Sequence, residues 1–373
     1  MKFDNINISG HKRRVLVAPL DWGLGHATRC IPIIYELLSL QIEVIIAADG
    51  AIKNLLKKEF PDVVFTQLKG YEIRYSSTMR GFAVGILLQF PKLLRAVYNE
   101  HWQLKKIIEK YKIDAVISDN RLGLYHATIP CIYITHQLQI KTHYRLTDWL
   151  AQQLHYFFIN KYAACWVPDN AAANNLAGTL SHPVKMPATT VEYLGPLSRF
   201  KKITCQKKYD LLLLLSGPEP QRSLFENKLL AAINAYPGSV LVVRGLPGIT
   251  ANEETALPAT GKITVVDHLP ATALNKAIQE AKLIICRSGY TTIMDLVQLQ
   301  QKAILVPTPG QTEQEYLARY LQAKQLFYSV PQHHFSLHDD MEKAAVFSYS
   351  DFPVSTDAYK KAVEELVKKI SGH

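Results

Sequence analysis

The residues best placed to do chemistry lie in the stretch 284–296, where an apolar run passes through Arg-Ser-Gly into a helical pattern. Gly289 lets the backbone approach a ligand closely, and the first amides of a helix carry unpaired N–H groups that bind anions. Ser288, Thr292 and Asp295 are spaced four and three residues apart, so they share one face of that helix, as groups that hold a ribose would. This spacing predicts a nucleotide site with its phosphate on Ser288 and Gly289. The alternative is that Ser288 only caps the helix and Asp295 is a solvated helix residue.

Composition limits the classes of protein to which the chain can belong. Its 373 residues are 48% hydrophobic and 20% charged, which is typical of a globular protein with room for two domains. Five scattered cysteines without a Cys-x-x-Cys pair argue against a disulfide framework and a zinc site, and indicate a reducing compartment. The amino terminus lacks the apolar core of a signal peptide, and no apolar stretch reaches the roughly 20 residues that cross a bilayer. We therefore expect a cytoplasmic protein that does not span a membrane.

The net charge of +10, with histidine neutral, indicates an anionic partner. Nucleic acid is disfavoured, because the sequence has no zinc-finger spacing, no aromatic RNA-binding signature and no dense Lys/Arg arm. The helical region 81–111 carries Phe90 and Leu94 close to Lys92, Arg95 and other basic residues. Such a helix can lie on an anionic membrane surface, which would place the protein at the inner face of the membrane. The commoner interpretation is a core-facing helix with a solvated basic face.

Short apolar runs alternate with helical patterns, which predicts parallel βαβ units with helices on both faces of each sheet. In the first half the expected strands are 15–19, 44–47, 115–118 and 132–135, and the expected helices are 27–40 and 51–60. In the second half the expected strands are 211–215, 240–243, 263–266, 283–286 and 303–306, and the expected helices are 221–235, 271–280, 291–299 and 313–323. The fold class is therefore α/β, with two doubly wound, Rossmann-like domains.

The join between the two halves is expected in the basic segment 195–208, which begins with Gly-Pro and has no clear period. We divide the chain into an amino-terminal domain at 1–197, a linker at 198–208, a second domain at 209–354 and a carboxy-terminal helix at 355–373. The tail 355–370 has the pattern of an amphipathic helix.

Three further segments accompany the Arg-Ser-Gly turn at 287–289. They are the Gly-Leu-Gly-His loop at 23–26, the Ser-Gly-Pro turn at 216–218 and the loop 307–315. Taken together, these segments resemble those of the family 28 glycosyltransferases of the GT-B fold. The resemblance covers about residues 13–370 and is strongest in the carboxy-terminal half; the family includes the transferase that forms lipid II of peptidoglycan. It implies two domains across a cleft, with a UDP-sugar donor on the second domain and the acceptor on the first. It also implies a carboxy-terminal helix that packs back toward the first domain.

The resemblance implies donor contacts for several turns of the second half. Ser216 and Gly217 match the first turn near the diphosphate, and His268 and Leu269 match a loop that lines the uracil. The Ser-Gly pair at 288–289 matches the phosphate turn, and Arg287 is a candidate charge beside it.

Three further positions on the donor side correspond to residues of the family pattern, and two of them differ from it. Asp295 stands where the family has a Glu that bonds the ribose hydroxyls. Gln314 stands where a Gln reads the sugar hydroxyls, and Glu315 replaces a second Gln. The identity of the sugar therefore does not carry over.

On the acceptor side, the resemblance assigns Gly23 and Gly25 to the first loop and His136 to a strand end at the cleft. The family's first loop is richer in glycine, and its second glycine-rich acceptor loop has no counterpart here beyond Arg-Leu-Gly at 121–123. Recognition of a lipid-pyrophosphate acceptor therefore does not carry over either.

Transfer of a sugar needs stabilisation of the departing diphosphate and deprotonation of the attacking hydroxyl. No Asp-x-Asp is present, so main-chain amides and an Arg are expected to serve the diphosphate without a metal or another cofactor. His26 is the expected general base, with Asp119 as its orienting partner, as in related GT-B enzymes that use such a pair. The structural alternative is that His26 caps a helix and Asp119 begins a turn. An inverting transferase is the favoured function, and a UDP-sugar hydrolase or a non-catalytic nucleotide-sugar-binding subunit is the alternative.

Overall fold

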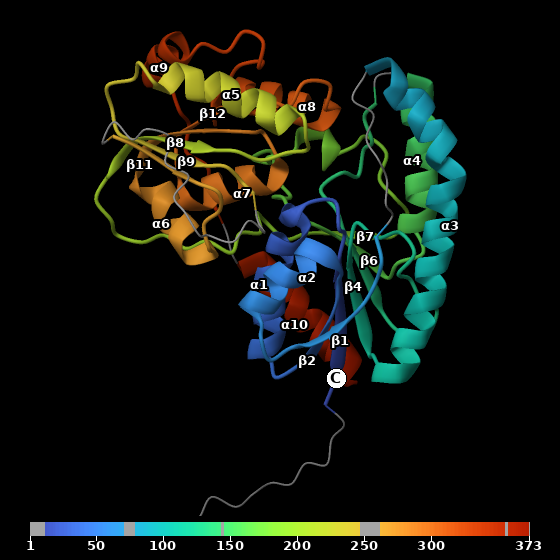
Figure 1. The fold of residues 1–373 in the computed structure, drawn as a ribbon. Helices are drawn as coiled ribbons and strands as arrows, with labels where there is room; N and C mark the ends of the chain where they lie inside the picture. Colours follow the sequence, from blue (N-terminus) through green and yellow to red (C-terminus); the bar gives the residue numbers. More distant parts are fainter. Residues whose placement is uncertain (1–11, 71–78, 143–144, 247–261, 355–356, 373) are drawn as a thin grey trace, which may run out of the picture.

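The structure contains two parallel β-sheets, each covered by helices (Figure 1). The computed structural model describes residues 12–70, 79–142, 145–246, 262–354 and 357–372, with the backbone alone at 79–90 and 145. The seven-stranded sheet has the order β3-β2-β1-β4-β5-β6-β7, and the six-stranded sheet has the order β10-β9-β8-β11-β12-β13. The expected α/β class with two doubly wound halves is confirmed.

The first sheet is built from residues 14–193. Its strands are β1 (Arg14–Pro19), β2 (Glu43–Ala47), β3 (Val64–Thr66), β4 (Ala115–Asp119), β5 (Cys131–Ile134), β6 (Ala164–Val167) and β7 (Thr190–Tyr193). Its helices are α1 (Leu24–Ser39), α2 (Gly50–Glu59), α3 (Met79–Tyr111) and α4 (Arg145–Ile159), with a 3-10 turn at Gly178–Leu180. Strands β4, β5 and β6 are buried along their whole length, as expected for parallel strands covered on both faces.

The second sheet begins after a segment, 194–208, that holds no helix or strand. Its strands are β8 (Tyr209–Leu214), β9 (Val240–Val243), β10 (Ile263–Val266), β11 (Ala281–Cys286), β12 (Ala303–Leu305) and β13 (Tyr328–Ser329). Its helices are α5 (Gln221–Ile233), α6 (Ala271–Glu280), α7 (Tyr290–Leu299), α8 (Thr312–Ala323) and α9 (Leu337–Val346). Polar residues that follow β8, β10, β11 and β12 are therefore brought to one edge of this sheet.

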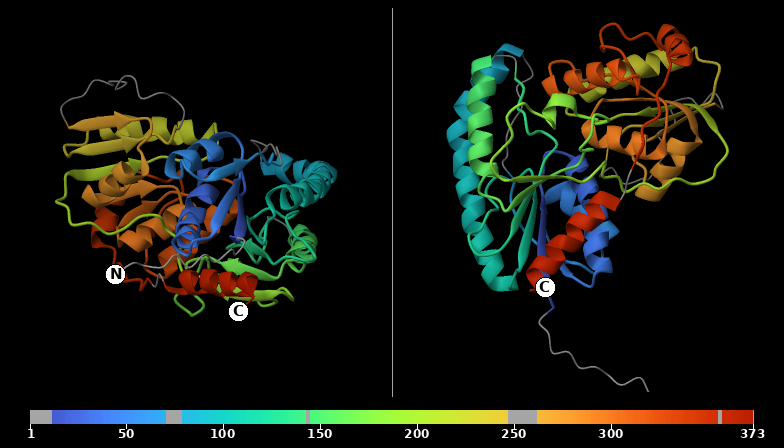
Figure 2. Two further views of the ribbon diagram at one scale, coloured as in Figure 1. Left: turned by 90° about the horizontal axis from the view of Figure 1, so that it is seen from below. Right: turned by 180° about the vertical axis from the view of Figure 1, so that it is seen from behind.

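The last helix, α10 (Asp357–Ser371), returns to the first sheet. It packs against α1 and β7, and Figure 2 shows it lying beside the amino-terminal helices rather than beside the second sheet. Its apolar side chains Val363, Leu366 and Ile370 are buried in a cluster that includes Ile34 of α1. The chain thus ties its carboxy-terminal end to its amino-terminal half, as expected.

The sequence pattern missed strands β3, β6, β7 and β13 and helices α4 and α9. Strands β3 and β7 have no fully buried residue, and β13 has only two residues, so none of them forms an apolar run. Helix α4 was missed because its exposed aromatic residues obscure the helical period. Helix α3 was expected at 81–111 and is observed at Met79–Tyr111. In the described part of the chain, no helix is long and apolar enough to cross a bilayer.

Candidate functional site

The amino-terminal turns of α1 and α7 meet between the two sheets. We call the meeting point of residues 23–29 and 289–291 the junction. Helix α1 starts after Gly23, whose φ of 104° favours glycine, and α7 starts after Gly289. Thr291 Oγ1 donates to the carbonyl oxygen of Gly25 at 3.3 Å, and a Cβ at Gly25 would lie only 2.8 Å from that hydroxyl. Two helix N-termini, with their unpaired amides, are therefore held close to one another.

His26 and Asp119, the expected catalytic pair, lie together at the junction. His26 is in the first turn of α1, and Asp119 ends β4, which pairs with β1 in the sheet. His26 Nδ1 lies 3.3 Å from Asp119 Oδ1. The side chain of Asp119 is wholly buried, whereas that of His26 keeps 16% of its surface exposed. This contact shows that Asp119 does more than begin a turn, and the catalytic role of the pair stays a prediction.

Arg29 connects the pair, although sequence reasoning gave it no role. It follows His26 by one helical turn and is 2% exposed. Its Nε donates to Asp119 Oδ2 at 2.6 Å, and its Nη2 donates to Asp119 Oδ1. The same Nη2 lies 2.6 Å from His26 Nδ1, and Nη1 lies 3.4 Å from His136 Nδ1. One guanidinium therefore contacts the carboxylate and both histidines.

The charges in this cluster change one another's protonation. Burial disfavours the ionised form of Asp119, but Arg29 and His26 outweigh burial and lower its pKa to about 2. Burial, and after it the positive charge of Arg29, lowers the pKa of His26, and Asp119 opposes this only in part. At neutral pH the cluster therefore contains a charged Asp119, a charged Arg29 and a neutral His26.

His136 joins the two halves of the molecule. Its ring stacks on Tyr290, the first residue of α7, with centroids 4.0 Å apart and 6° between the planes. His136 Nε2 lies 2.8 Å from Glu313 Oε1 in α8. Burial opposes a charge on Glu313, but His136 and then Arg29 outweigh burial and lower the pKa of Glu313. Glu313 thus completes a polar contact between the halves.

The turns expected to hold the diphosphate follow β8 and β11. Ser216 and Gly217 are exposed, and Gly217 has a φ of 110° that favours glycine. A Cβ at Gly289 would have no neighbour nearer than Thr292 Oγ1, at 4.0 Å. Both turns therefore leave the backbone open to close approach by an anion.

Arg287 and Ser288, in contrast, are turned inward. Ser288 Oγ donates to the backbone carbonyl of Gln314 at 2.9 Å, and Ser288 is fully buried. Arg287 donates to the carbonyl oxygens of Gln221 and Val306 at 2.9 and 3.2 Å. Its guanidinium holds the backbone around the turn, and its role as a charge beside the diphosphate stays a prediction. The main chain at Gly289 is left open to a ligand at this turn.

Asp295 contacts the segment between the sheets. Its Oδ1 accepts a hydrogen bond from Ser198 Oγ at 2.5 Å. Burial raises the pKa of Asp295 to about 7, which Ser198 and Arg199 oppose only in part. The alternative that Asp295 is simply a solvated helix residue is therefore wrong. Thr292, on the same face of α7, is half-buried.

The loop expected to line the nucleobase follows β10. His268 is exposed and Leu269 is half-buried against the core. The pKa of His268 is lowered by partial burial and then by Arg199, the same residue that acts on Asp295. Arg199 thus influences both the predicted ribose residue and the predicted base loop.

Gln314 and Glu315, expected to read the sugar, hold the loop that precedes α8. Gln314 Oε1 accepts from the amide of Thr308 at 2.9 Å, and Glu315 Oε1 accepts from the amide of Gly310 at 2.9 Å. Glu313 is the member of this run that reaches the first half of the molecule. The structure therefore gives Gln314 and Glu315 a loop-holding role, and their contact with a sugar stays a prediction.

Metal-ligating residues do not gather in the part of the chain that the structure describes, where no three or more His, Cys, Asp or Glu are placed to hold an ion. All five cysteines are free thiols, four of them buried.

Comparison with known proteins shows which proteins the chain is similar to. The glycosyltransferase SnogD from Streptomyces nogalater has the same fold, with a TM-score of 0.64 at 11% identity, over 96% of this chain and 100% of that chain. Residues 251–370, which include the turn at Gly289 and helices α7 and α8, match the glycosyltransferase family 28 C-terminal domain. The chain is a GT-B glycosyltransferase with a family 28 carboxy-terminal domain.

Two further proteins are similar to this chain. An uncharacterized glycosyltransferase of Methanosarcina acetivorans is 22% identical over 322 residues, which is 80% of this chain and 79% of the relative. The spinosyn rhamnosyltransferase SpnG, in a complex with thymidine diphosphate, is similar with a TM-score of 0.56 at 16% identity, over 96% of each chain.

Sequence reasoning missed three residues that make contacts at or near the junction, namely Arg29, Thr291 and Glu313. Arg29 ends the Gly-x-Gly-His-x-x-Arg loop and lies one turn from His26, which was the available signal. Thr291 and Glu313 each stand next to a residue that was selected, Thr292 and Gln314. Helical spacing alone could not tell which neighbour faces the other half of the glycosyltransferase.

If Asp295 holds the ribose of the donor, Asp295→Asn should weaken UDP binding about tenfold at pH 8, because a neutral amide is a poorer acceptor than a carboxylate. Since the pKa of Asp295 is raised to about 7, its charge is present only above that pH. The affinity ratio of wild type to variant should therefore grow from pH 6 to pH 8, as measured by calorimetry. Asp339→Asn, on the exposed face of α9, is the matched control. An equal affinity at pH 8 would remove Asp295 from the site.

Proposed function

We propose that the protein is an inverting, metal-independent glycosyltransferase that moves a hexose or N-acetylhexosamine from a UDP-sugar to a hydroxyl acceptor. The observation that carries the proposal is the junction, where two helix N-termini meet beside His26 and Asp119. It offers main-chain amides for a leaving diphosphate and an imidazole with a carboxylate for the acceptor hydroxyl. A lipid or glycan precursor of the cell envelope is the acceptor class that we favour, bound on domain 1–197.

The donor is proposed to lie along the edge of the second sheet. Its diphosphate would rest on the open turns at Gly217 and Gly289, where amide N–H groups and the dipole of α7 stabilise the charge that develops on UDP. Asp295 would accept from the ribose hydroxyls, and the loop of His268 and Leu269 would line the uracil. The thymidine diphosphate bound by SpnG supports a nucleoside diphosphate in a fold of this kind.

His26 is proposed to deprotonate the acceptor. The acceptor oxygen attacks the anomeric carbon, the bond from that carbon to the diphosphate oxygen breaks, and the bonding electron pair leaves with UDP. The acceptor proton passes to Nε2 of His26, and Nδ1–H donates to Asp119, whose charge stabilises the imidazolium. Direct displacement on one face of the sugar inverts the anomeric configuration.

The proposed function is tested by incubating the pure protein with UDP-sugars and dTDP-sugars, with and without a cell lipid and metabolite extract. Mass spectrometry of the products should show a glycosylated acceptor formed only with a UDP-sugar. In a separate measurement by NMR, the anomeric configuration of that product should be inverted relative to the donor. Equal release of UDP without acceptor would identify a hydrolase instead. Tight binding of UDP-sugar without turnover in any mixture would identify a nucleotide-sugar-binding subunit.

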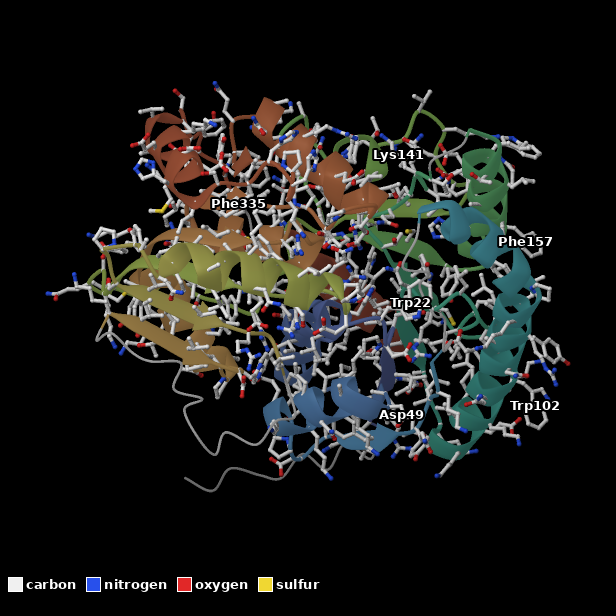
Figure 3. All side chains as sticks on the ribbon, turned by 45° about the horizontal axis from the view of Figure 1, so that its top comes forward. Trp22, Asp49, Trp102, Lys141, Phe157 and Phe335 are labelled. Atoms are coloured by element: carbon white, nitrogen blue, oxygen red, sulfur yellow. The ribbon has the colours of Figure 1, made fainter. Side chains whose placement is uncertain are left out.

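We also propose that α3 and α4 contact an anionic membrane surface. The two helices lie side by side on the edge of the molecule away from the second sheet, and Val97 of α3 shares an apolar cluster with Phe158 of α4 (Figures 1 and 2). Their outward side, which we call the aromatic surface, exposes Leu94, Tyr98, Trp102, Leu146, Trp149, Leu150 and Phe157. Figure 3 shows Trp102 and Phe157 on this outer edge.

Lysines accompany the rings of the aromatic surface. The ammonium of Lys106 lies 3.8 Å from the ring centre of Trp102, and that of Lys161 lies 4.3 Å from the ring of Phe157. Aromatic rings beside lysines suit the headgroup region of an anionic bilayer. The earlier apolar positions of α3, including Phe90, have side chains outside the described residues.

Replacing Trp102 and Trp149 together with serine should weaken binding to anionic vesicles by about tenfold or more, because binding scales with the apolar area that is buried. Sedimentation with phosphatidylglycerol vesicles measures this, and higher salt should weaken wild-type binding as well. Leu224→Ser, an exposed apolar position on α5, is the matched control and should bind as wild type does. Binding that is equal on neutral and anionic vesicles, or unchanged in the double variant, would contradict the proposal.

A further inference from the structure

Arg29 restricts where protons can sit on the two histidines of the junction. A guanidinium is always protonated and only donates hydrogen bonds, so any ring nitrogen that it contacts must act as an acceptor. Arg29 Nη2 lies 2.6 Å from His26 Nδ1, which is a short and charge-assisted contact. In neutral His26 the single proton must then be on Nε2.

We propose that Arg29 is a positioning residue that holds His26 in the tautomer with its proton on Nε2. The tautomer that can act as a base has its proton on Nδ1 and a lone pair on Nε2. It forms only when Nδ1 of His26 stops accepting from Arg29 and instead donates to Asp119. The consequence for catalysis rests on the function proposed for His26, whereas the tautomer itself does not.

The contacts of His136 obey the same rule. Arg29 Nη1 lies 3.4 Å from His136 Nδ1, and His136 Nε2 lies 2.8 Å from Glu313 Oε1. Since a carboxylate only accepts, Nε2 must carry a proton, and in the neutral form of the ring Nδ1 is left as the acceptor. Arg29 therefore faces an acceptor nitrogen on both rings.

The opposite tautomer of His26 conflicts with its surroundings. A proton on Nδ1 would point at a donating N–H of Arg29 only 2.6 Å away, while Asp119 Oδ1 is farther, at 3.3 Å. Both oxygens of Asp119 already accept hydrogen bonds from Arg29. Losing a hydrogen bond to a charged group disfavours the Nδ1–H form by about ten- to a hundredfold.

The other titratable groups around His26 leave this arrangement intact. Helix α1 contributes Arg29 and Cys30, and burial raises the pKa of the Cys30 thiol well above its ordinary value, so that the thiol stays neutral. The remaining groups are Asp119 at the end of β4, His136 after β5 and Glu313 in α8. The ligand-free enzyme therefore presents an N–H, and no lone pair, at Nε2 of His26. A water molecule that reaches Nε2 cannot be deprotonated there.

The direct test is nitrogen NMR of the ligand-free protein labelled with ¹⁵N-histidine at pH 8, where His26 is neutral. The signals of His26 are assigned by their loss in His26→Gln, and the shifts of the two ring nitrogens report which one is protonated. The expected result is Nε2–H for His26. A predominant Nδ1–H form would overturn the proposal, and this measurement needs no variant of Arg29.

Arg29→Lys tests the cause. A lysine keeps the charge beside Asp119 but loses the fork that also reaches the ring, so the tautomer ratio of His26 should move about tenfold toward Nδ1–H. Arg121→Lys is the matched control, since Arg121 is also fully buried and paired with a carboxylate, Glu100 at 2.6 Å, and should leave His26 unchanged.

An unchanged ratio in Arg29→Lys would overturn the proposal. Because the tautomer is measured without substrate, the proposal about Arg29 can be correct even if turnover shows that His26 is not the base. Conversely, finding the Nδ1–H tautomer would contradict this proposal but not the proposed transfer reaction.

Discussion

Replacing His26 with glutamine is expected to lower kcat by about 10²-fold or more while leaving the affinity for UDP unchanged. Glutamine can still accept a hydrogen bond from Arg29, but it cannot take the proton of the acceptor hydroxyl. The measurement is the initial rate of product formation at saturating donor, together with UDP binding by calorimetry. Equal activity in His26→Gln would return His26 to the role of a helix-terminal residue.

The pH dependence of the same reaction gives a second test of whether His26 is the general base. Burial and Arg29 lower the pKa of His26, so kcat/KM of the wild type should rise with pH through a midpoint below the ordinary 6.5. His26→Gln should lack this rise. His126→Gln is the matched control, because the ring of His126 contacts Thr128 in its own loop, and this variant should keep both the rate and the profile.

Much of the fold could be predicted because parallel strands that are covered on both faces consist of uninterrupted apolar residues. The run Leu211–Leu215 and the strand β11 are of this kind, and both were placed within two residues of their observed ends. Edge strands lack that signal, which is why β7, with Glu192 and Tyr193 half-buried, was not recognised. Its place became clear only from its pairing with β6.

The candidate site could be predicted only as far as strand ends determine it. His26 and Asp119 follow β1 and β4, and the pairing of these strands brings them together. The direction of a side chain within a turn depends on packing that spacing does not reveal. Arg287 therefore turned inward to backbone carbonyls, and Glu313 rather than Gln314 reached the other half.

Removing the charge of Asp119 should have the largest effect on stability. Asp119→Ala leaves Arg29 buried without its carboxylate, and breaking a buried pair in this way costs about 3–5 kcal/mol of unfolding free energy. The double variant Arg29→Met/Asp119→Leu removes both charges and should recover most of that loss without recovering activity. Urea unfolding measures the cost. Asp114→Asn, which weakens a half-exposed pair with Arg13 at the start of the same strand, should cost only about 1 kcal/mol.

The stability that Asp119 contributes should also depend on pH in a defined direction. Its pKa is lowered to about 2 in the folded protein, so its contribution is fully present above the ordinary value of 3.8 and is lost as the pH falls toward 2. A shift of this size corresponds to about 2 kcal/mol. Asp119→Asn has no such group, so the difference in unfolding free energy between wild type and this variant should narrow from pH 5 to pH 3. A difference that stays constant over this range would mean that the Arg29 pair does not hold the carboxylate in its charged form.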